Sequence, residues 1–201
     1  MDKILETRQE IYDYFQSNNA CQEFFLNSSN KERYVAYYTS MFLIKNATES
    51  VWDHRNKGFS QDAHEAYLEF WGVMQAIIIQ QDSICELYWA VKSQKLDWND
   101  LESWKKIREI RNICAGHPAK IDRPSDKPLK RTFMGPSFGN YSSFHYEQWE
   151  KPMTSSKSEY ILNNITHPEI KLGTIVDDYS EEAANKLREI LQSMKKQWPI
   201  T

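Results

Sequence analysis

Residues 67–91 read YLEFWGVMQAIIIQQDSICELYWAV and carry the most regular apolar pattern in the chain. Spacings of three and four alternate along this pattern for about four heptads, which is the periodicity of one helix face. The positions on that face are Tyr67, Phe70, Met74, Ile77, Gln81, Ile84, Tyr88 and Val91, and a second apolar flank consists of Trp71, Ile78, Cys85 and Trp89. A helix that is apolar on two sides is typical of the centre of a helical bundle.

Further helices are expected on both sides of this one, because no proline precedes Pro118 and Gly58 and Gly72 are the only glycines among the first 115 residues. The patterns predict helices over 2–17, 31–57, from about 101 to Gly116 or Pro118, and 180–198, with Gly58 ending the second. The predicted inner residues of the first helix are Ile4, Leu5, Ile11 and Phe15, with Tyr12 left open. Those of the second are Tyr34, Tyr38, Met41, Thr48 and Trp52, flanked by Phe42 and Val51, and those of the fourth are Trp104, Ile107, Ile110, Ile113 and Cys114.

The chain changes character after Pro118, where five prolines fall within 35 residues. Residues 131–134 and 141–146 favour β-structure and predict a hairpin, and residues 171–177 suggest another strand. We therefore expect an all-α antiparallel bundle that forms one domain over 1–201, with residues 119–178 as a loop and β-hairpin insertion before the last helix.

Composition excludes several classes of protein. No apolar run approaches the roughly 20 residues of a membrane helix, and the N-terminus lacks the apolar core of a signal peptide, so a cytoplasmic protein without membrane contact is expected. The net charge is −3, yet nine basic and three acidic residues fall between positions 104 and 131. Such a basic strip is either a solvated surface or a phosphate-binding one. Its candidate RNA contacts are Lys105, Lys106, Arg108, Lys120 and Arg123.

The residues with the clearest chemical potential lie in residues 107–118, IREIRNICAGHP. Arg111 falls on the apolar stripe of its helix, where a charge needs a partner anion, either a carboxylate such as Asp82 or a substrate phosphate. His117 stands where Pro118 should end the helix, and is either a general acid and base or a residue that stabilises the helix terminus. Asp82 either orients the arginine or histidine or faces solvent.

The arrangement Arg111-Asn112-x-x-x-x-His117 resembles the R-x(4–6)-H motif of HEPN domains, including the polar residue after the arginine. The resemblance implies an α-helical, usually dimeric bundle. It also implies a metal-independent endoribonuclease of a toxin–antitoxin or phage-defence system, in which Arg111 and His117 are catalytic and Asn112 assists. Some members carry a tyrosine two residues after the histidine that a partner nucleotidyltransferase modifies. Ala119 occupies that position here, so the resemblance does not extend to that mode of control.

The chemistry agrees with RNA cleavage by the 2′-hydroxyl, because histidine titrates near neutrality and a guanidinium can bind phosphate through two hydrogen bonds. No cluster has metal-ligand spacing, and neither a metal nor a cofactor is expected. On an ideal helix, Arg111 and His117 point about 120° apart, which favours a homodimer with a composite site. An antitoxin protein is among the expected partners. The alternatives are a non-catalytic helical module that binds RNA, a nucleotide or a partner protein, and a structural dimer in which Arg111 belongs to a buried ion pair. His54, His64, His145 and His167 receive no role.

Overall fold

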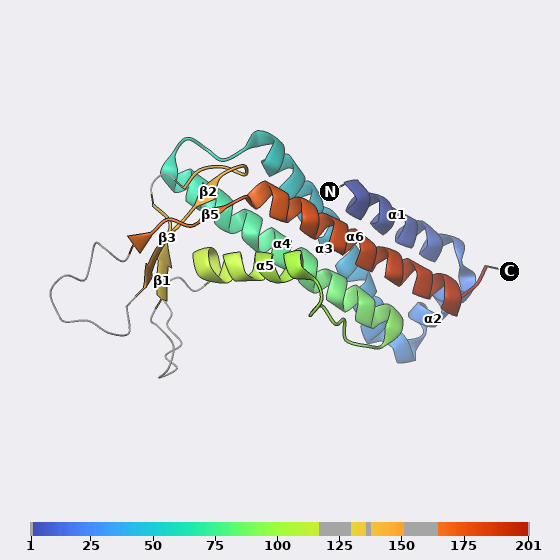
Figure 1. Ribbon diagram of the computed structural model, residues 1–201. Helices are drawn as coiled ribbons and strands as arrows, with labels where there is room; N and C mark the ends of the chain where they lie inside the picture. Colours follow the sequence, from blue (N-terminus) through green and yellow to red (C-terminus); the bar gives the residue numbers. More distant parts are fainter. Residues whose placement is uncertain (1, 117–129, 136–137, 151–164, 201) are drawn as a thin grey trace.

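The computed structural model describes residues 2–116, 130–135, 138–150 and 165–200. Within these ranges the chain is mostly helical, with short strands near one end of the bundle (Figure 1). The helical elements are α1 (Asp2–Ser17), α2 (Asn19–Leu26), η1 (Ser28–Asn30), α3 (Lys31–Lys57), α4 (Ala63–Lys92), α5 (Glu102–Arg111), η2 (Asn112–Gly116) and α6 (Leu172–Gln197). The strands are β1 (Lys130–Phe133), β2 (Phe144–His145), β3 (Glu147–Glu150), β4 (Ile165–Thr166) and β5 (Glu169–Ile170).

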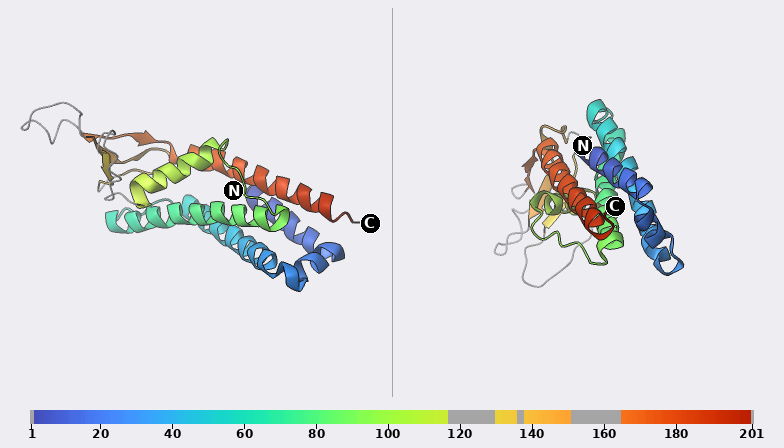
Figure 2. Two further views of the ribbon diagram at one scale, coloured as in Figure 1. Left: turned by 90° about the horizontal axis from the view of Figure 1, so that it is seen from below. Right: turned by 90° about the vertical axis from the view of Figure 1, so that its right-hand side faces the viewer.

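Helix α4 is the centre of the bundle and contacts α3, α5 and α6, while α1 packs against α6 and α3 (Figures 1 and 2). The turn between α3 and α4 has a clear local cause. Gly58 ends α3 with a φ of 78°, a conformation that favours glycine, and the Asp62 carboxylate accepts hydrogen bonds from the first backbone N–H groups of α4. The expected bundle of helices is confirmed, and so is the end of α3 at Gly58.

The predicted face of α4 is buried from Phe70 to Val91, with Tyr67 half-buried at its start. The prediction for α3 was partly wrong, because Tyr38, Phe42 and Trp52 are 64%, 58% and 40% exposed. Helix α3 carries aromatic and aliphatic side chains on all of its faces, so the sequence pattern does not show which face is buried. That face carries Tyr37, Met41, Ile44, Thr48 and Val51. Tyr12 of α1 is exposed as well.

The strands pair differently from the expected hairpin. β1 pairs with β3 and β3 with β4 in one antiparallel sheet, whereas β2 pairs with β5 in a second. The two segments predicted to pair with each other therefore belong to different sheets. The strand predicted over 171–177 is wrong as well, since α6 already begins at Leu172, where Leu172 and Val176 are buried one helical turn apart.

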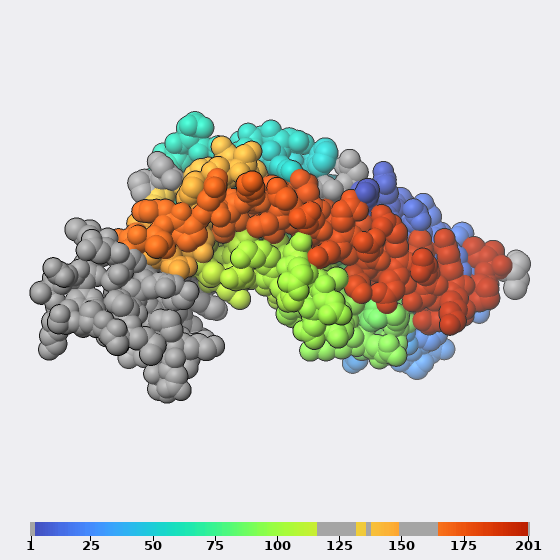
Figure 3. Space-filling model, viewed as in Figure 1, coloured from blue at the N-terminus to red at the C-terminus, as the bar shows by residue number. Residues whose placement is uncertain are grey.

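Helices α5 and α6 lie side by side on one face of the molecule (Figure 3). The start of α5 is fixed by α6, because the Glu182 carboxylate accepts hydrogen bonds from the backbone N–H groups of Ser103 and Trp104, at 3.0 and 2.9 Å. These donors have no partner within their own helix. None of the helices in the described residues is long and apolar enough to cross a membrane.

Candidate functional site

Helix α5 ends at Arg111, the first residue of the predicted catalytic motif, and Asn112 follows in η2. Helix α5 buries Trp104, Ile107 and Ile110 against α4 and α6, and the Trp104 ring meets Tyr179 edge-on at 5.6 Å. The buried Gln81 side chain of α4 donates to the Trp104 carbonyl. These interactions fix the rotation of α5, and they place Arg111, its last residue, at the edge of the bundle.

Arg111 is half-buried and contacts two amide oxygens. One terminal nitrogen donates to Oδ1 of Asn112 at 3.1 Å, and the other lies 3.4 Å from Oε1 of Gln75 on α4. Among the described residues no carboxylate forms an ion pair with Arg111. An amide oxygen carries no net charge, so the positive charge of this guanidinium is not neutralised by these two hydrogen bonds.

Asp82 does not contact Arg111, contrary to one of the expected roles. It forms an ion pair with Arg108, which also lies over the ring of Trp98 at 5.4 Å. Helices α4 and α5 run antiparallel, so Arg108, one turn before Arg111, meets a later residue of α4 (Figure 1). Arg108, which was predicted to contact RNA, therefore has partners within the protein and connects α4 with α5.

Lys105 and Lys106, the remaining described candidates for RNA contact, form ion pairs on the surface of α5. Lys105 pairs with Glu102 at 2.6 Å and Lys106 with Glu109 at 2.8 Å, each three residues away. Exposed pairs of this kind contribute roughly 0–1 kcal/mol, so a phosphate can replace the carboxylate at little cost. His117, Lys120 and Arg123 lie outside the described residues.

The chain leaves α5 in an unusual conformation. From Asn112 to Gly116 it continues as a π-helix, a form that is rare and is often found at functional sites. The carbonyl of Ile113 accepts a hydrogen bond from Oγ1 of Thr132 on β1 at 2.6 Å, so the β-structure supports this segment. Cys114 is buried here, and burial raises the pKa of its thiol to about 12, which keeps it protonated and unreactive.

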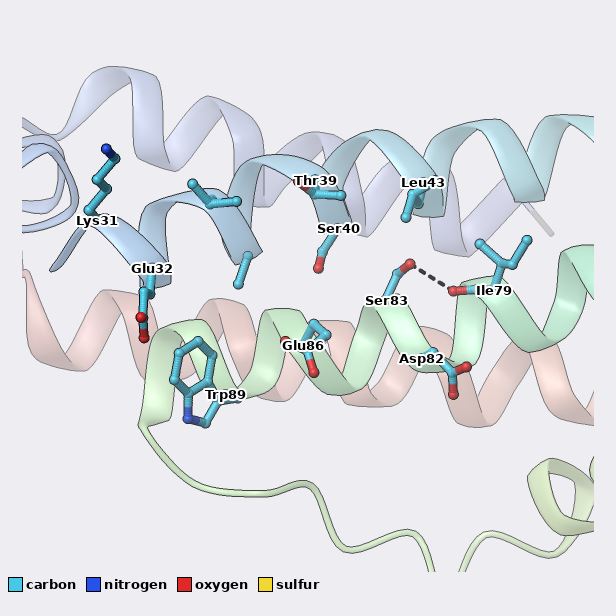
Figure 4. A pocket seen from close by; sticks show the side chains of 12 residues that line it. Lys31, Glu32, Thr39, Ser40, Leu43, Ile79, Asp82, Ser83, Glu86 and Trp89 are labelled. Atoms are coloured by element: carbon cyan, nitrogen blue, oxygen red, sulfur yellow. Dashed lines mark hydrogen bonds between the residues drawn. The ribbon is translucent and has the colours of Figure 1, made fainter.

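A long apolar groove runs between α3 and α4 (Figure 4). Its volume is about 720 Å³. Val35, Leu43, Ile79 and Trp89 contribute apolar surface. The charged residues along it are Lys31, Glu32, Asp82 and Glu86. Asp82 belongs both to this groove and to the ion pair with Arg108, so the groove reaches the interface between α4 and α5.

One histidine without an expected role joins the helices to the β-region. Nδ1 of His54 lies 2.8 Å from the Tyr141 hydroxyl, and Nε2 lies 3.5 Å from the Glu69 carboxylate. The backbone N–H of Ser60, with smaller contributions from Lys57 and His54, outweighs desolvation and lowers the pKa of Glu69. The sequence offered no signal for this cluster, because Tyr141 is 87 residues from His54.

No three His, Cys, Asp or Glu side chains gather in a way that could hold a metal ion, within the parts of the chain that the structure describes. Comparison of the chain with protein-family models, with curated proteins and with solved structures finds no match.

Proposed function

We propose that the protein is a metal-independent endoribonuclease that acts on RNA in the cytoplasm. The observation that carries this proposal is the state of Arg111. It ends α5 where the π-helix begins, its described partners are two neutral amides, and the expected general acid and base, His117, follows six residues later in the sequence. A guanidinium without a carboxylate partner is suited to bind a phosphate.

In the proposed reaction, His117 removes the proton of a ribose 2′-hydroxyl, and the oxygen attacks the adjacent phosphorus. The bond to the 5′-oxygen of the next nucleotide breaks, and that oxygen receives the proton that His117 removed, which leaves a 2′,3′-cyclic phosphate and a 5′-hydroxyl and returns His117 to its starting state. Arg111 stabilises the charge on the phosphorane, and Asn112 holds a phosphate oxygen or orients the guanidinium, with which it is already hydrogen-bonded.

The resemblance to HEPN domains supports a role in bacterial defence or in a toxin–antitoxin pair. A neighbouring gene for an antitoxin or a nucleotidyltransferase would strengthen that assignment. Its absence from the neighbourhood would favour a different cellular role for the same reaction.

Incubation of single-stranded RNA with the protein in EDTA tests the activity. We expect the wild type and His64→Ala to cleave, and His117→Ala to be about 10²- to 10⁴-fold less active, the usual effect of removing an acid–base group. Arg111→Ala should be about 10²- to 10³-fold less active, the usual effect of removing a group that stabilises charge in the transition state. His64 is the matched control because it is an exposed histidine at the start of α4. Equal cleavage by wild type and His117→Ala would contradict the proposal.

A homodimer is part of the proposal, and the groove between α3 and α4 supports it. Val35 and Leu43 are exposed apolar side chains on its wall, and a second copy, or an antitoxin in its place, would cover them. We expect light scattering at micromolar concentration to give twice the 23.8 kDa of one chain. Val35→Glu with Leu43→Glu should give a monomer, and Leu26→Glu, an exposed apolar position on α2, should not. A wild-type monomer that cleaves RNA would refute an active site built from residues of both chains.

A further inference from the structure

A ladder of aromatic rings ends in an exposed tryptophan on α4. Phe138 is buried, the Tyr67 ring stacks on it with centroids 5.5 Å apart and planes 24° apart, and Trp71 stacks on Tyr67 at 6.3 Å and 20°. The Tyr67 hydroxyl donates to the carbonyl of Met134 at 2.5 Å, which fixes the middle ring. Trp71 is therefore held by protein on one side, and 44% of the residue is exposed.

Gln75 links this tryptophan to the candidate catalytic arginine. Trp71 and Gln75 are four residues apart on α4 and so occupy the same face, with Cβ atoms about 6 Å apart. Gln75 is the residue that Arg111 contacts across the helix interface. An open aromatic ring and a guanidinium that pairs with no carboxylate of the described residues therefore both neighbour Gln75, which puts them within the span of a single nucleotide.

We propose that Trp71 is the platform on which a base of the RNA substrate stacks, next to the phosphate that Arg111 binds. This inference rests on the proposed ribonuclease function and names a binding residue for it. Every base has a flat face that stacks on an aromatic ring, so the platform selects single-stranded RNA with little preference for sequence.

The position of the charge favours RNA over a protein partner at this place. Leu68 on α4 and Phe133 on β1 are also exposed, and alone they would suit any apolar surface. An apolar protein interface centred on Trp71 would bury the Arg111 charge without an anion, which is unfavourable. A nucleotide supplies both a ring for Trp71 and an anion for Arg111.

The test measures binding of two oligomers of equal length, a fluorescein-labelled single-stranded RNA and an abasic ribose-phosphate chain, by fluorescence anisotropy. His117→Ala is the background, so that cleavage does not interfere. Trp71→Ala should weaken binding of RNA by about 5- to 150-fold, the usual effect of removing the platform for one stacked base. It should leave binding of the abasic chain and the salt dependence unchanged, because the groups that bind phosphate remain.

Two variants serve as controls. Trp71→Phe keeps a ring and should restore most of the binding. Trp52→Ala removes a tryptophan of similar exposure on α3 and should have no effect on RNA binding. Trp52 shares a face of α3 with Lys45 and Glu49, and those two residues line a hollow against α1. Circular dichroism confirms that each variant is folded. If Trp71→Ala is not folded, Trp71→Leu carries the test, because it keeps an apolar side chain but no ring on which a base can stack.

The outcomes separate this inference from the function on which it rests. If the background protein binds RNA and Trp71→Ala binds it equally well, the platform is refuted and the ribonuclease proposal stands. The platform is also refuted if the RNA and the abasic chain bind to the background protein with equal affinity. It is refuted as well if Trp71→Ala changes the oligomeric state of the protein and leaves RNA binding unchanged. If the background protein binds neither oligomer, both proposals fail.

Discussion

Arg108 of α5 forms an ion pair with Asp82 of α4, one helical turn before Arg111 on the same edge of α5. The pair leaves Asp82 unavailable to Arg111, whose described partners are the amides of Asn112 and Gln75. One arginine therefore joins the two helices, and the next one along the edge meets no carboxylate among the described residues, so its charge suits an anion.

The Arg108–Asp82 pair should contribute little to stability, because more than half of the Asp82 side chain is exposed. Asp82→Ala is expected to lower the free energy of unfolding by no more than about 1 kcal/mol. RNA cleavage should remain within a few-fold of wild type. Urea denaturation and the cleavage assay measure both, with Glu86→Ala, an exposed glutamate of the same helix, as the control. Loss of cleavage at intact stability would instead assign Asp82 to the active site.

The buried chain of hydrogen bonds between α6, α4 and α3 should contribute more to the free energy of unfolding than the Arg108–Asp82 ion pair does. The Tyr179 hydroxyl donates to Oε1 of Gln80 at 2.7 Å, and Nε2 of Gln80 donates to Oγ1 of Thr48 at 2.6 Å. Tyr179→Phe leaves the Gln80 oxygen without its donor in the core, which should cost about 1–3 kcal/mol of unfolding free energy. Tyr38→Phe, at an exposed position of α3, should be neutral in the same denaturation experiment. Equal stability of both variants would mean that the hydrogen-bond chain contributes nothing.

Acid should weaken the interface between α4 and α6. Burial alone would raise the pKa of Glu189, but hydrogen bonds from Lys92, Lys186 and Tyr88 outweigh it and lower the pKa to about 2. The ordinary value is 4.5, so this contribution to stability is complete above pH 4.5 and is lost as the pH falls toward 2.

Glu189→Gln should therefore lower the Tm at pH 6 and have a smaller effect at pH 2.5. Thermal unfolding followed by circular dichroism at the two pH values measures the difference. Since the Glu189 carboxylate is partly exposed, added salt should reduce the Tm difference between wild type and Glu189→Gln at pH 6. A Tm difference that is the same at both pH values would show that the ion pairs of Glu189 do not stabilise the fold.

The lysines of α5 should affect binding of RNA but not the position of cleavage. Lys105→Glu with Lys106→Glu is expected to weaken binding and to reduce the salt slope by about 0.7 for each phosphate that the variant no longer binds. Lys45→Glu is the matched control, because Lys45 also pairs with a glutamate of its own helix, on α3. Anisotropy titrations from low to high salt measure the slope. An unchanged slope in the double variant would show that these lysines are only a solvated surface.

Local patterns were sufficient to locate most helices and insufficient to locate the strand partners. The helix over 31–57 was predicted with the bounds that α3 has, and Gly58 ends it as expected. α2 was not predicted, because a helix of eight residues is too short for a periodic pattern. The strand segments are two to four residues long, so the sequence indicates extended structure but not which segments pair.

The candidate site divides in the same way. The motif that names Arg111, Asn112 and His117 is visible in the sequence alone, because it depends on spacing within one segment. The sequence does not show which arginine pairs with Asp82. Asp82 lies 26 residues from Arg108 and 29 from Arg111, and one helical turn along α5 decides which of the two arginines it contacts. The periodicity places Trp71 on an apolar flank of its helix, and nothing in that pattern distinguishes Trp71 from the buried residues around it.

The sequence by itself determined the helical class, the central position of α4 and the order of the polar residues along α5, because these depend on side chains three or four positions apart. Tertiary structure alone decided which apolar residues are buried, which arginine is neutralised and which aromatic ring stays open. These outcomes depend on the rotation and crossing of neighbouring helices, and the packing of many distant residues in the core sets them together.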